Sequence, residues 1–148
     1  AEGFAPGFAR WLEREASRPV RMAVPGAPLQ PGMVQLAPTG CHLKVQGNQV
    51  ITDQSPPLHN CRPAVDALFH SLAEDNLAPE TVAVLLTGMG TDGAEGLAAL
   101  RHKGAHTIAQ DEASCAVFGM PKAAIDLGAA AQILPLEQIP EVAGRLFE

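Results

Sequence analysis

Apolar residues near the start of the chain recur at helical spacing. Phe4, Phe8, Trp11 and Leu12 fall at i, i+4, i+7 and i+8, which places them on one stripe of a helix, and Pro19 lies beyond its end. The pattern predicts a helix that begins almost at the first residue. So large an apolar face on an opening helix predicts that an earlier segment of polypeptide packs against it.

From residue 20 the pattern changes to short alternating segments, which are typical of strands. The predicted strands cover residues 20–24, 33–37, 42–46 and 49–52. The last two flank Gly47-Asn48, a pair that suits a two-residue hairpin turn. The polar, proline-rich stretch 53–63 is interpreted as a long surface loop.

After Pro63 the pattern alternates between helix and strand. A stripe of Val65, Leu68, Phe69 and Leu72 predicts the first helix of this half. Strands are then predicted at 81–86, 105–110 and 130–135, and helices at 93–103, 120–127 and 136–147. The run at 81–86 is continuously apolar, which predicts a strand covered on both faces.

This alternation is typical of βαβ units on a parallel sheet. We therefore predict the α/β class: one domain over residues 1–148, in three layers (α/β/α), with a mostly parallel sheet and an antiparallel hairpin appendage. A length of 148 residues with 47% hydrophobic composition fits a single core.

Charge and cysteine content exclude several kinds of function. Ten Lys and Arg against 16 Asp and Glu give a net charge of −6, which argues against nucleic-acid binding. No apolar run is long enough to span a membrane, and the first residues do not resemble a signal peptide. Cys41, Cys61 and Cys115 are an odd number at irregular spacing, which favours reduced thiols. We therefore expect a cytoplasmic protein without membrane insertion.

The densest chemical signal is the run LLTGMGTDGAEG. Gly88, Gly90 and Gly93 follow a predicted strand as G-x-G-x-x-G, and Asp111 stands close to twenty residues downstream, so the pattern matches a dinucleotide-binding fingerprint. Asp92 argues against that interpretation, because a carboxylate in this turn would repel a bound pyrophosphate.

Three interpretations of Asp92 remain open from the residues alone. It is a helix N-cap with no further role, part of a nucleotide site, or a catalytic carboxylate aimed out of the carboxyl edge of the sheet, where ligands of open α/β sheets bind. For Gly88 and Gly90 the plain structural interpretation is a tight turn that needs positive φ.

A second polar cluster, AQDEASCAVFGMPKAAI, follows the next strand. If the two strands are neighbours, Gln110 and the residues after it emerge beside the glycine-rich turn. Gly119 and Pro121 suit a turn followed by a helix, and Met120 is interpreted as packing rather than chemistry.

A zinc site is the weakest candidate. Cys41-His42 and His59-Asn60-Cys61 provide possible ligands, but adjacent Cys and His rarely reach one tetrahedral ion and no finger spacing is present. We predict neither a metal nor a cofactor.

The two blocks TGMGTDGAEGL (87–97) and AQDEASCAVFGMPKAAI (109–125) resemble the signature blocks of the CheB family, the chemotaxis receptor protein-glutamate methylesterases. GFAPGFARWLE, LQPGMVQLAPTGCHL and RPAVDALFHSLA are also similar to segments of that catalytic domain, in the same order. The resemblance covers nearly the whole chain.

The resemblance implies hydrolysis of glutamyl methyl esters on chemoreceptor cytoplasmic helices, and deamidation of selected glutamines, through a Ser-His-Asp triad. Asp92 falls on the triad aspartate, and Met89 falls where the family places a backbone N–H beside the oxyanion. Gly88, Gly90, His42, Gln110 and Met120 are expected to line the substrate site. The implied partners are the methylated receptor and an N-terminal receiver domain.

The chain also departs from the family pattern. The family's serine and histidine would both precede Ala1, and Ala64 stands where the family often has serine. We therefore expect a catalytic domain that lacks its N-terminal segment and is inactive as this chain alone. Two alternatives stay open: a dinucleotide-binding module at the glycine-rich turn, and a catalytically inactive domain that docks on receptors.

Overall fold

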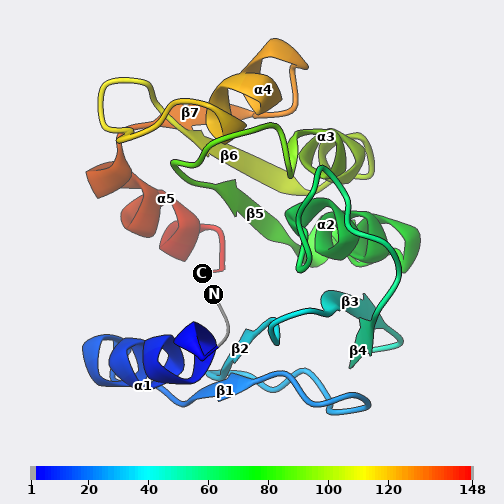
Figure 1. Cartoon of the computed structure of the whole chain (residues 1–148). Coiled ribbons are helices and arrows are strands. Elements are labelled where there is room, and N and C mark those ends of the chain that lie inside the picture. Colours follow the sequence, from blue (N-terminus) through cyan, green and yellow to red (C-terminus); the bar gives the residue numbers. More distant parts are fainter. Residues whose placement is uncertain (1–2, 148) are drawn as a thin grey trace.

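The computed structural model describes residues 3–147, which form five helices and seven strands (Figure 1). The helices are α1 (Phe4–Ala16), α2 (Val65–Glu74), α3 (Ala94–His102), α4 (Met120–Asp126) and α5 (Ile139–Arg145), and the short 3-10 turns are η1 (Ala78–Glu80) and η2 (Leu136–Gln138). The strands are β1 (Val20–Met22), β2 (Val34–Leu36), β3 (His42–Gln46), β4 (Gln49–Asp53), β5 (Val82–Leu85), β6 (His106–Gln110) and β7 (Gln132–Leu134).

The second half of the chain forms a parallel sheet in the order β5-β6-β7. Val84 pairs with Ile108, and Ala109 pairs with Ile133. Because the strands are parallel, β5 and β6 end at the same edge, so the segments that follow them leave the sheet side by side. The expected neighbourhood of the glycine-rich turn and the second polar cluster is confirmed.

The first half contributes two smaller strand pairs. Strands β1 and β2 pair in parallel, and β3 and β4 form the expected antiparallel hairpin. Its two central residues, Gly47 and Asn48, both have positive φ (56° and 64°), as a type I′ turn requires. The α/β class with mostly parallel pairing and an antiparallel hairpin is therefore confirmed.

The main core lies between the sheet and the helices α2, α3 and α4. Leu97 and Leu100 of α3 are completely buried against Phe69 of α2 and Leu85 of β5. Burial of one such leucine contributes roughly 1.5–3 kcal/mol, so this cluster fixes α3 against one face of the sheet.

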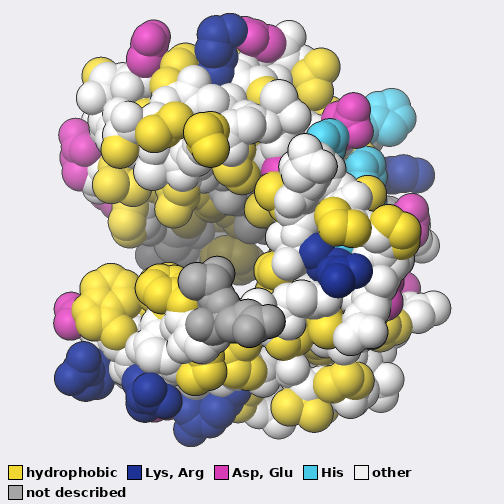
Figure 2. Space-filling view, viewed as in Figure 1, with side chains coloured by type: hydrophobic (Ala, Val, Ile, Leu, Met, Phe, Trp, Pro, Cys, Tyr) yellow, Lys and Arg dark blue, Asp and Glu magenta, His cyan; other side chains and the backbone are white. Residues whose placement is uncertain are grey.

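The strand expected to be covered on both faces is fully covered on only one. Helices α3 and α4 pack on the face that carries Ala83 and Leu85, whereas Val82 and Val84 are half-buried. That prediction is wrong for the described residues, because nothing in residues 3–147 covers the second face to the same depth. Figure 2 shows the molecule hollowed between the half that carries α1 and the half that carries α5.

Apolar side chains of α1 face solvent beside this hollow. Phe4 is 65% exposed and Trp11 is 47% exposed, and with Phe8 they line an open cavity of about 550 Å³. The rings of Phe4, Phe8 and Trp11 stack on one another along the helix. The predicted apolar stripe is therefore present, and no described segment covers it.

The first and last predicted helices are both present, and the last one is interrupted. The helix expected over 136–147 is divided into η2 and α5, because Pro140 has no amide proton to donate to the carbonyl of Leu136. The first helix begins at Phe4, and the first two residues lie outside the described part. Among the described helices, none has the length and apolar character that a bilayer span needs.

Candidate functional site

The glycine-rich turn after β5 is closed by the segment before α4. Gly88 donates its amide to the carbonyl of Val117 (3.1 Å) and accepts the amide of Met120 (2.8 Å). A Cβ at Gly88 would stand 2.5 Å from Sδ of Met120, and a Cβ at Gly119 would stand 2.7 Å from the Gly88 carbonyl oxygen. At Gly119 a side chain would meet backbone atoms, whereas at Gly88 it would meet the flexible side chain of Met120, which would have to move.

Backbone conformation explains the other two glycines of the motif. Gly90 and Gly93 have φ of +95° and +91°, whereas Gly88 is not in the positive-φ region. The expectation of positive φ is therefore confirmed for Gly90 and wrong for Gly88, where close packing of Met120 is the reason for glycine.

Asp92 caps a helix, but not the one that follows it. Its Oδ2 accepts the amide of Val65 (2.7 Å) and its Oδ1 accepts the amide of Asp66 (3.0 Å), both in the first turn of α2. At the start of α3 the N-cap position is Gly93, which provides no side chain to cap the helix. Two amides at the positive end of α2 thus fix the plane of the Asp92 carboxylate.

The Asp92 carboxylate is buried, with 5% of the residue exposed, and it makes no ion pair within residues 3–147. Each of its oxygens accepts one amide, which leaves one further acceptor position on each. The arrangement can orient a donor from outside the described residues, such as an imidazole N–H.

The side chain of Asp66 caps α3 in the same way. Its carboxylate Oδ1 accepts the amide of Gly96 (2.7 Å), and its Oδ2 lies 2.8 Å from Nε2 of His59. Each of the two helices is therefore capped by a carboxylate that comes from the other helix or the turn before it.

Met89 projects from the tip of the glycine-rich turn, with 85% of the residue exposed. Its backbone amide donates to no acceptor within residues 3–147. The turn therefore carries, at the carboxyl edge of the sheet, an amide that has no acceptor within residues 3–147.

Gln110 is buried at the end of β6 and joins three segments. Its Oε1 accepts the amide of Thr87 (2.7 Å), and its Nε2 donates to the carbonyl of Ser114 (2.8 Å). The Thr87 hydroxyl in turn donates to Val117 (3.0 Å) and accepts its amide (2.9 Å). These contacts hold the glycine-rich turn against the second loop.

His42 is also buried, at the start of β3. Its Nδ1 accepts the amide of Ala64 (3.2 Å) and its Nε2 lies 3.0 Å from the carbonyl of Pro56, an arrangement that fits a neutral ring protonated on Nε2. The structure places His42 next to the start of α2, where its ring supports the loop that carries Pro63.

The structure brings Gly88, Gly90, Met89 and Met120 together with Gln110 at one edge of the sheet, and it places Asp92 beside the start of α2. Sequence reasoning missed Thr87 and Asp66. Asp66 in the first turn of a predicted helix was a signal for an acidic residue near the helix dipole, but its reach to another helix has no sequence signal.

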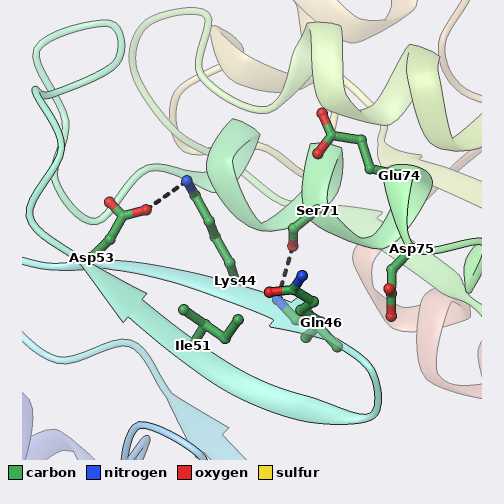
Figure 3. Close-up of a pocket in the computed structure, with 8 residues that line it drawn as sticks. Lys44, Gln46, Ile51, Asp53, Ser71, Glu74 and Asp75 are labelled. Atoms are coloured by element: carbon green, nitrogen blue, oxygen red, sulfur yellow. Dashed lines mark hydrogen bonds and ion pairs between the residues drawn. The ribbon is translucent and has the colours of Figure 1, made fainter.

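A separate cavity of about 370 Å³ lies between the hairpin and α2 (Figure 3). Lys44 pairs with Asp53 across it (2.6 Å), and the Ser71 hydroxyl accepts the amide of Val45 (2.9 Å). The Lys44 ammonium, followed by the hydroxyl and amide of Ser55, holds the pKa of Asp53 well below its ordinary value. The ion pair joins the two strands of the hairpin, and the Ser71 contact attaches the hairpin to α2.

The fold and site define a protein of the α/β class. Its polar groups and the Met89 amide meet at the carboxyl edge of a parallel sheet, where proteins of this class usually bind their ligands. The sequence profile of the CheB methylesterase family matches residues 1–143. The chain therefore belongs to the CheB methylesterase family.

Relatives of the chain carry the names of protein-glutamate methylesterases. Protein-glutamate methylesterase/protein-glutamine glutaminase 1 of Cupriavidus pinatubonensis is 48% identical over 139 residues, which are 93% of this chain and 40% of that protein. Protein-glutamate methylesterase/protein-glutamine glutaminase 3 of Pseudomonas aeruginosa is 46% identical over 148 residues, or 44% of that protein. The chain thus spans about two fifths of the length of these relatives.

A solved structure has the same fold. The crystal structure of the Thermotoga maritima CheB methylesterase catalytic domain superposes with a TM-score of 0.92 at 37% identity. The match covers 99% of this chain and 79% of that one.

Proposed function

We propose that this chain is part of the catalytic domain of an enzyme that hydrolyses glutamyl methyl esters, and deamidates selected glutamines, on chemoreceptor cytoplasmic helices. The relatives that carry these two activities in their names match over nearly the whole chain. The observation that carries the proposal is the Asp92 carboxylate, which is buried, accepts two amides and makes no ion pair with any residue that the structure describes.

Asp92 is proposed as the acid of a Ser-His-Asp triad. It would accept a hydrogen bond from the histidine, fix the tautomer of the ring and stabilise the imidazolium that forms when serine loses its proton. A carboxylate that the α2 amides already orient meets this requirement, since it needs no rearrangement when the histidine arrives.

The serine and histidine are proposed to come from a segment outside this chain. The exposed apolar face of α1 and the hollow beside it support this view, because they leave surface for additional strands (Figure 2). About a fifth of the solved relative's chain also lies outside the match.

The chemistry follows from these placements. The serine oxygen attacks the γ-carbonyl carbon of the ester while the histidine takes its proton, and the carbonyl oxygen becomes an oxyanion. In this proposal the Met89 amide would donate a hydrogen bond to that oxyanion. The histidine then gives this proton to the leaving oxygen of the ester, which departs as methanol, or to the leaving nitrogen of the glutamine amide, which departs as ammonia. Water hydrolyses the remaining acyl–serine ester, which releases the glutamate and restores the serine.

The remaining residues of the edge have supporting roles in this proposal. Gly88 and Gly90 shape the turn that presents Met89, Gln110 and Met120 hold that turn in place, and His42 supports the loop before α2. The proposed partners are methylated chemoreceptors in the cytoplasm and a receiver domain on the same polypeptide.

Methanol release from methylated receptor membranes tests the proposal. In the full-length protein, Asp92→Asn is expected to lower turnover by about 10⁴-fold, the scale for a triad aspartate. Residues 1–148 alone are expected to release no methanol; activity from them would overturn the assignment of the nucleophile to another segment.

A matched control separates catalysis from folding, because Asp92 also caps α2. Ser71→Ala removes another buried acceptor of a backbone amide farther along α2 and is expected to lower stability without a comparable loss of turnover. Near-normal turnover of Asp92→Asn would show that Asp92 acts only as a helix cap.

The dinucleotide alternative receives no support from the geometry. The Gly96 amide near the start of α3 is already taken by Asp66, and Oδ1 of Asp111 accepts the amide of Ser114 (3.0 Å). Calorimetric titration with dinucleotides is therefore expected to give no saturable heat. The catalytically inactive docking domain predicts that the full-length protein releases no methanol, so the same assay distinguishes it from the esterase.

A further inference from the structure

Three ligand-type side chains meet beside the starts of α2 and α3, outside the proposed triad. One nitrogen of His59, one oxygen of Asp66 and one oxygen of Glu95 all lie within 4.8 Å of one another. The residues come from a loop and two helices. The sequence offered Cys41, His42 and Cys61 as possible co-ligands of His59, whereas in the structure two carboxylates lie beside it.

His59 is held in position by its own tight turn. Leu58 and Cys61 exchange two backbone hydrogen bonds (3.0 and 2.7 Å), and the residues between them, His59 and Asn60, both have positive φ (50° and 62°). This is the geometry of a type I′ turn, which fixes the direction of the imidazole toward α2.

Asp66 is fixed more firmly still. The residue is 1% exposed, its Oδ1 accepts the Gly96 amide, and its Oδ2 lies 2.8 Å from Nε2 of His59. Glu95, in the first turn of α3, is exposed and completes the group from the solvent side. Two of the three ligands are thus preorganised, and the third can adjust.

The charges around this group are not balanced within residues 3–147. Asp66, Asp92 and Glu95 are three carboxylates around the starts of two helices, and none of them makes an ion pair with Lys or Arg. His59 compensates Asp66 only when its ring is protonated. A metal ion at this group would compensate carboxylate charge that a neutral imidazole leaves unbalanced, and buried charges in proteins are normally paired or coordinate a metal.

We propose that His59, Asp66 and Glu95 bind a divalent transition metal ion of the zinc type. One imidazole nitrogen and two carboxylate oxygens are ligands that Zn²⁺ accepts, and three protein ligands leave a position for water. Mg²⁺ and Ca²⁺ prefer sites made of oxygen alone, so the imidazole favours the transition metal.

The bound ion would add a further link between the His59 turn and the starts of α2 and α3, which the Asp66 carboxylate already connects through His59 and the Gly96 amide. It would attach the loop at 53–63 to the starts of α2 and α3, next to the amides that hold Asp92. The proposal does not depend on the esterase activity.

Calorimetric titration of the full natural chain with Zn²⁺ tests the site. One equivalent is expected to bind, and His59→Gln and Glu95→Gln are each expected to weaken binding by at least about tenfold. Zn²⁺ should also raise the Tm of the unsubstituted protein and leave the Tm of His59→Gln little changed. Asp66 is not substituted, because it also caps α3.

Two controls identify the ligands. His102→Gln changes an exposed histidine at the far end of α3, and Cys61→Ser removes the thiol nearest His59; both are expected to bind Zn²⁺ as the unsubstituted protein does. Absence of saturable binding, unchanged affinity in both His59→Gln and Glu95→Gln, or a thiolate charge-transfer band with Co²⁺ would each overturn the proposal.

Discussion

The carboxylate of Asp92 accepts the backbone amide of Asp66, and the carboxylate of Asp66 in turn accepts the amide of Gly96 in the helix that follows Asp92. The first turns of α2 and α3 are thereby joined through two acidic side chains rather than capped separately. Any shift of α2 therefore moves the carboxylate proposed to orient the catalytic histidine.

This relationship predicts energetic coupling between the two aspartates. Asp66→Ala and Asp92→Ala each leave buried amides without acceptors, at a cost of about 1–3 kcal/mol. Because the side chains serve one junction, the double variant should deviate from additivity by about 0.5–3 kcal/mol. Urea denaturation of the four proteins measures the coupling, and additive effects would show that the two caps act independently.

Close packing at the same junction predicts an unusual response at Gly96. Alanine in place of a helical glycine normally stabilises by about 0.5–1 kcal/mol. At Gly96 a Cβ would stand 2.6 Å from Cβ of Phe69 and 2.8 Å from Oδ1 of Asp66, so Gly96→Ala is expected to destabilise by about 1–3 kcal/mol instead.

Gly144 in α5 provides the matched control, because a Cβ there would meet nothing within 4 Å. Gly144→Ala is therefore expected to follow the ordinary rule and stabilise the protein. Denaturation midpoints that move in the same direction for Gly96→Ala and Gly144→Ala would contradict the packing argument.

The two close-packed glycines at the sheet edge should differ in their effect on activity. A Cβ at Gly119 would stand 2.7 Å from the carbonyl oxygen of Gly88 and 3.2 Å from Cα of Met89, so the backbone itself must move. A Cβ at Gly88 would meet mainly the flexible end of Met120. We expect Gly119→Ala to lower methanol release by roughly 10²-fold, the scale for a displaced catalytic group, and Gly88→Ala to lower it less.

Both variants are assayed in the full-length protein beside Gly144→Ala, which lies away from the edge. Equal turnover of Gly119→Ala and Gly88→Ala would show that the position of the Met89 amide does not limit the reaction.

Local patterns were sufficient to predict most of the fold. The alternation of apolar runs after Pro63 predicted the order of strands and helices, and Gly47-Asn48 predicted the hairpin turn that the structure contains. Such features depend on neighbours in the sequence, so one chain is enough to find them.

The contacts that shape the candidate site are different in kind. Asp92 reaches the amide of Val65 across 27 positions, and Asp66 reaches Gly96 across 30. No periodicity encodes such pairs. The turn at 88–93 was recognised from its glycines, but the reason for Gly88, the approach of Met120, became visible only in three dimensions.

The ion pair between Lys44 and Asp53 of the hairpin predicts a specific dependence of stability on pH. The Lys44 ammonium lowers the pKa of Asp53 in the folded protein below its ordinary value of 3.8. A carboxyl group whose pKa is lowered on folding contributes stability above its unfolded pKa and loses that contribution as the pH falls toward its folded pKa.

Asp53→Asn keeps an oxygen for Ser55 but removes the charge, and it is expected to cost up to about 1 kcal/mol at neutral pH because the pair is partly exposed. Urea denaturation from pH 7 downward should show the two proteins converging only below pH 3.8, whereas a difference that stays constant into strong acid would mean that the charge of Asp53 does not stabilise the hairpin.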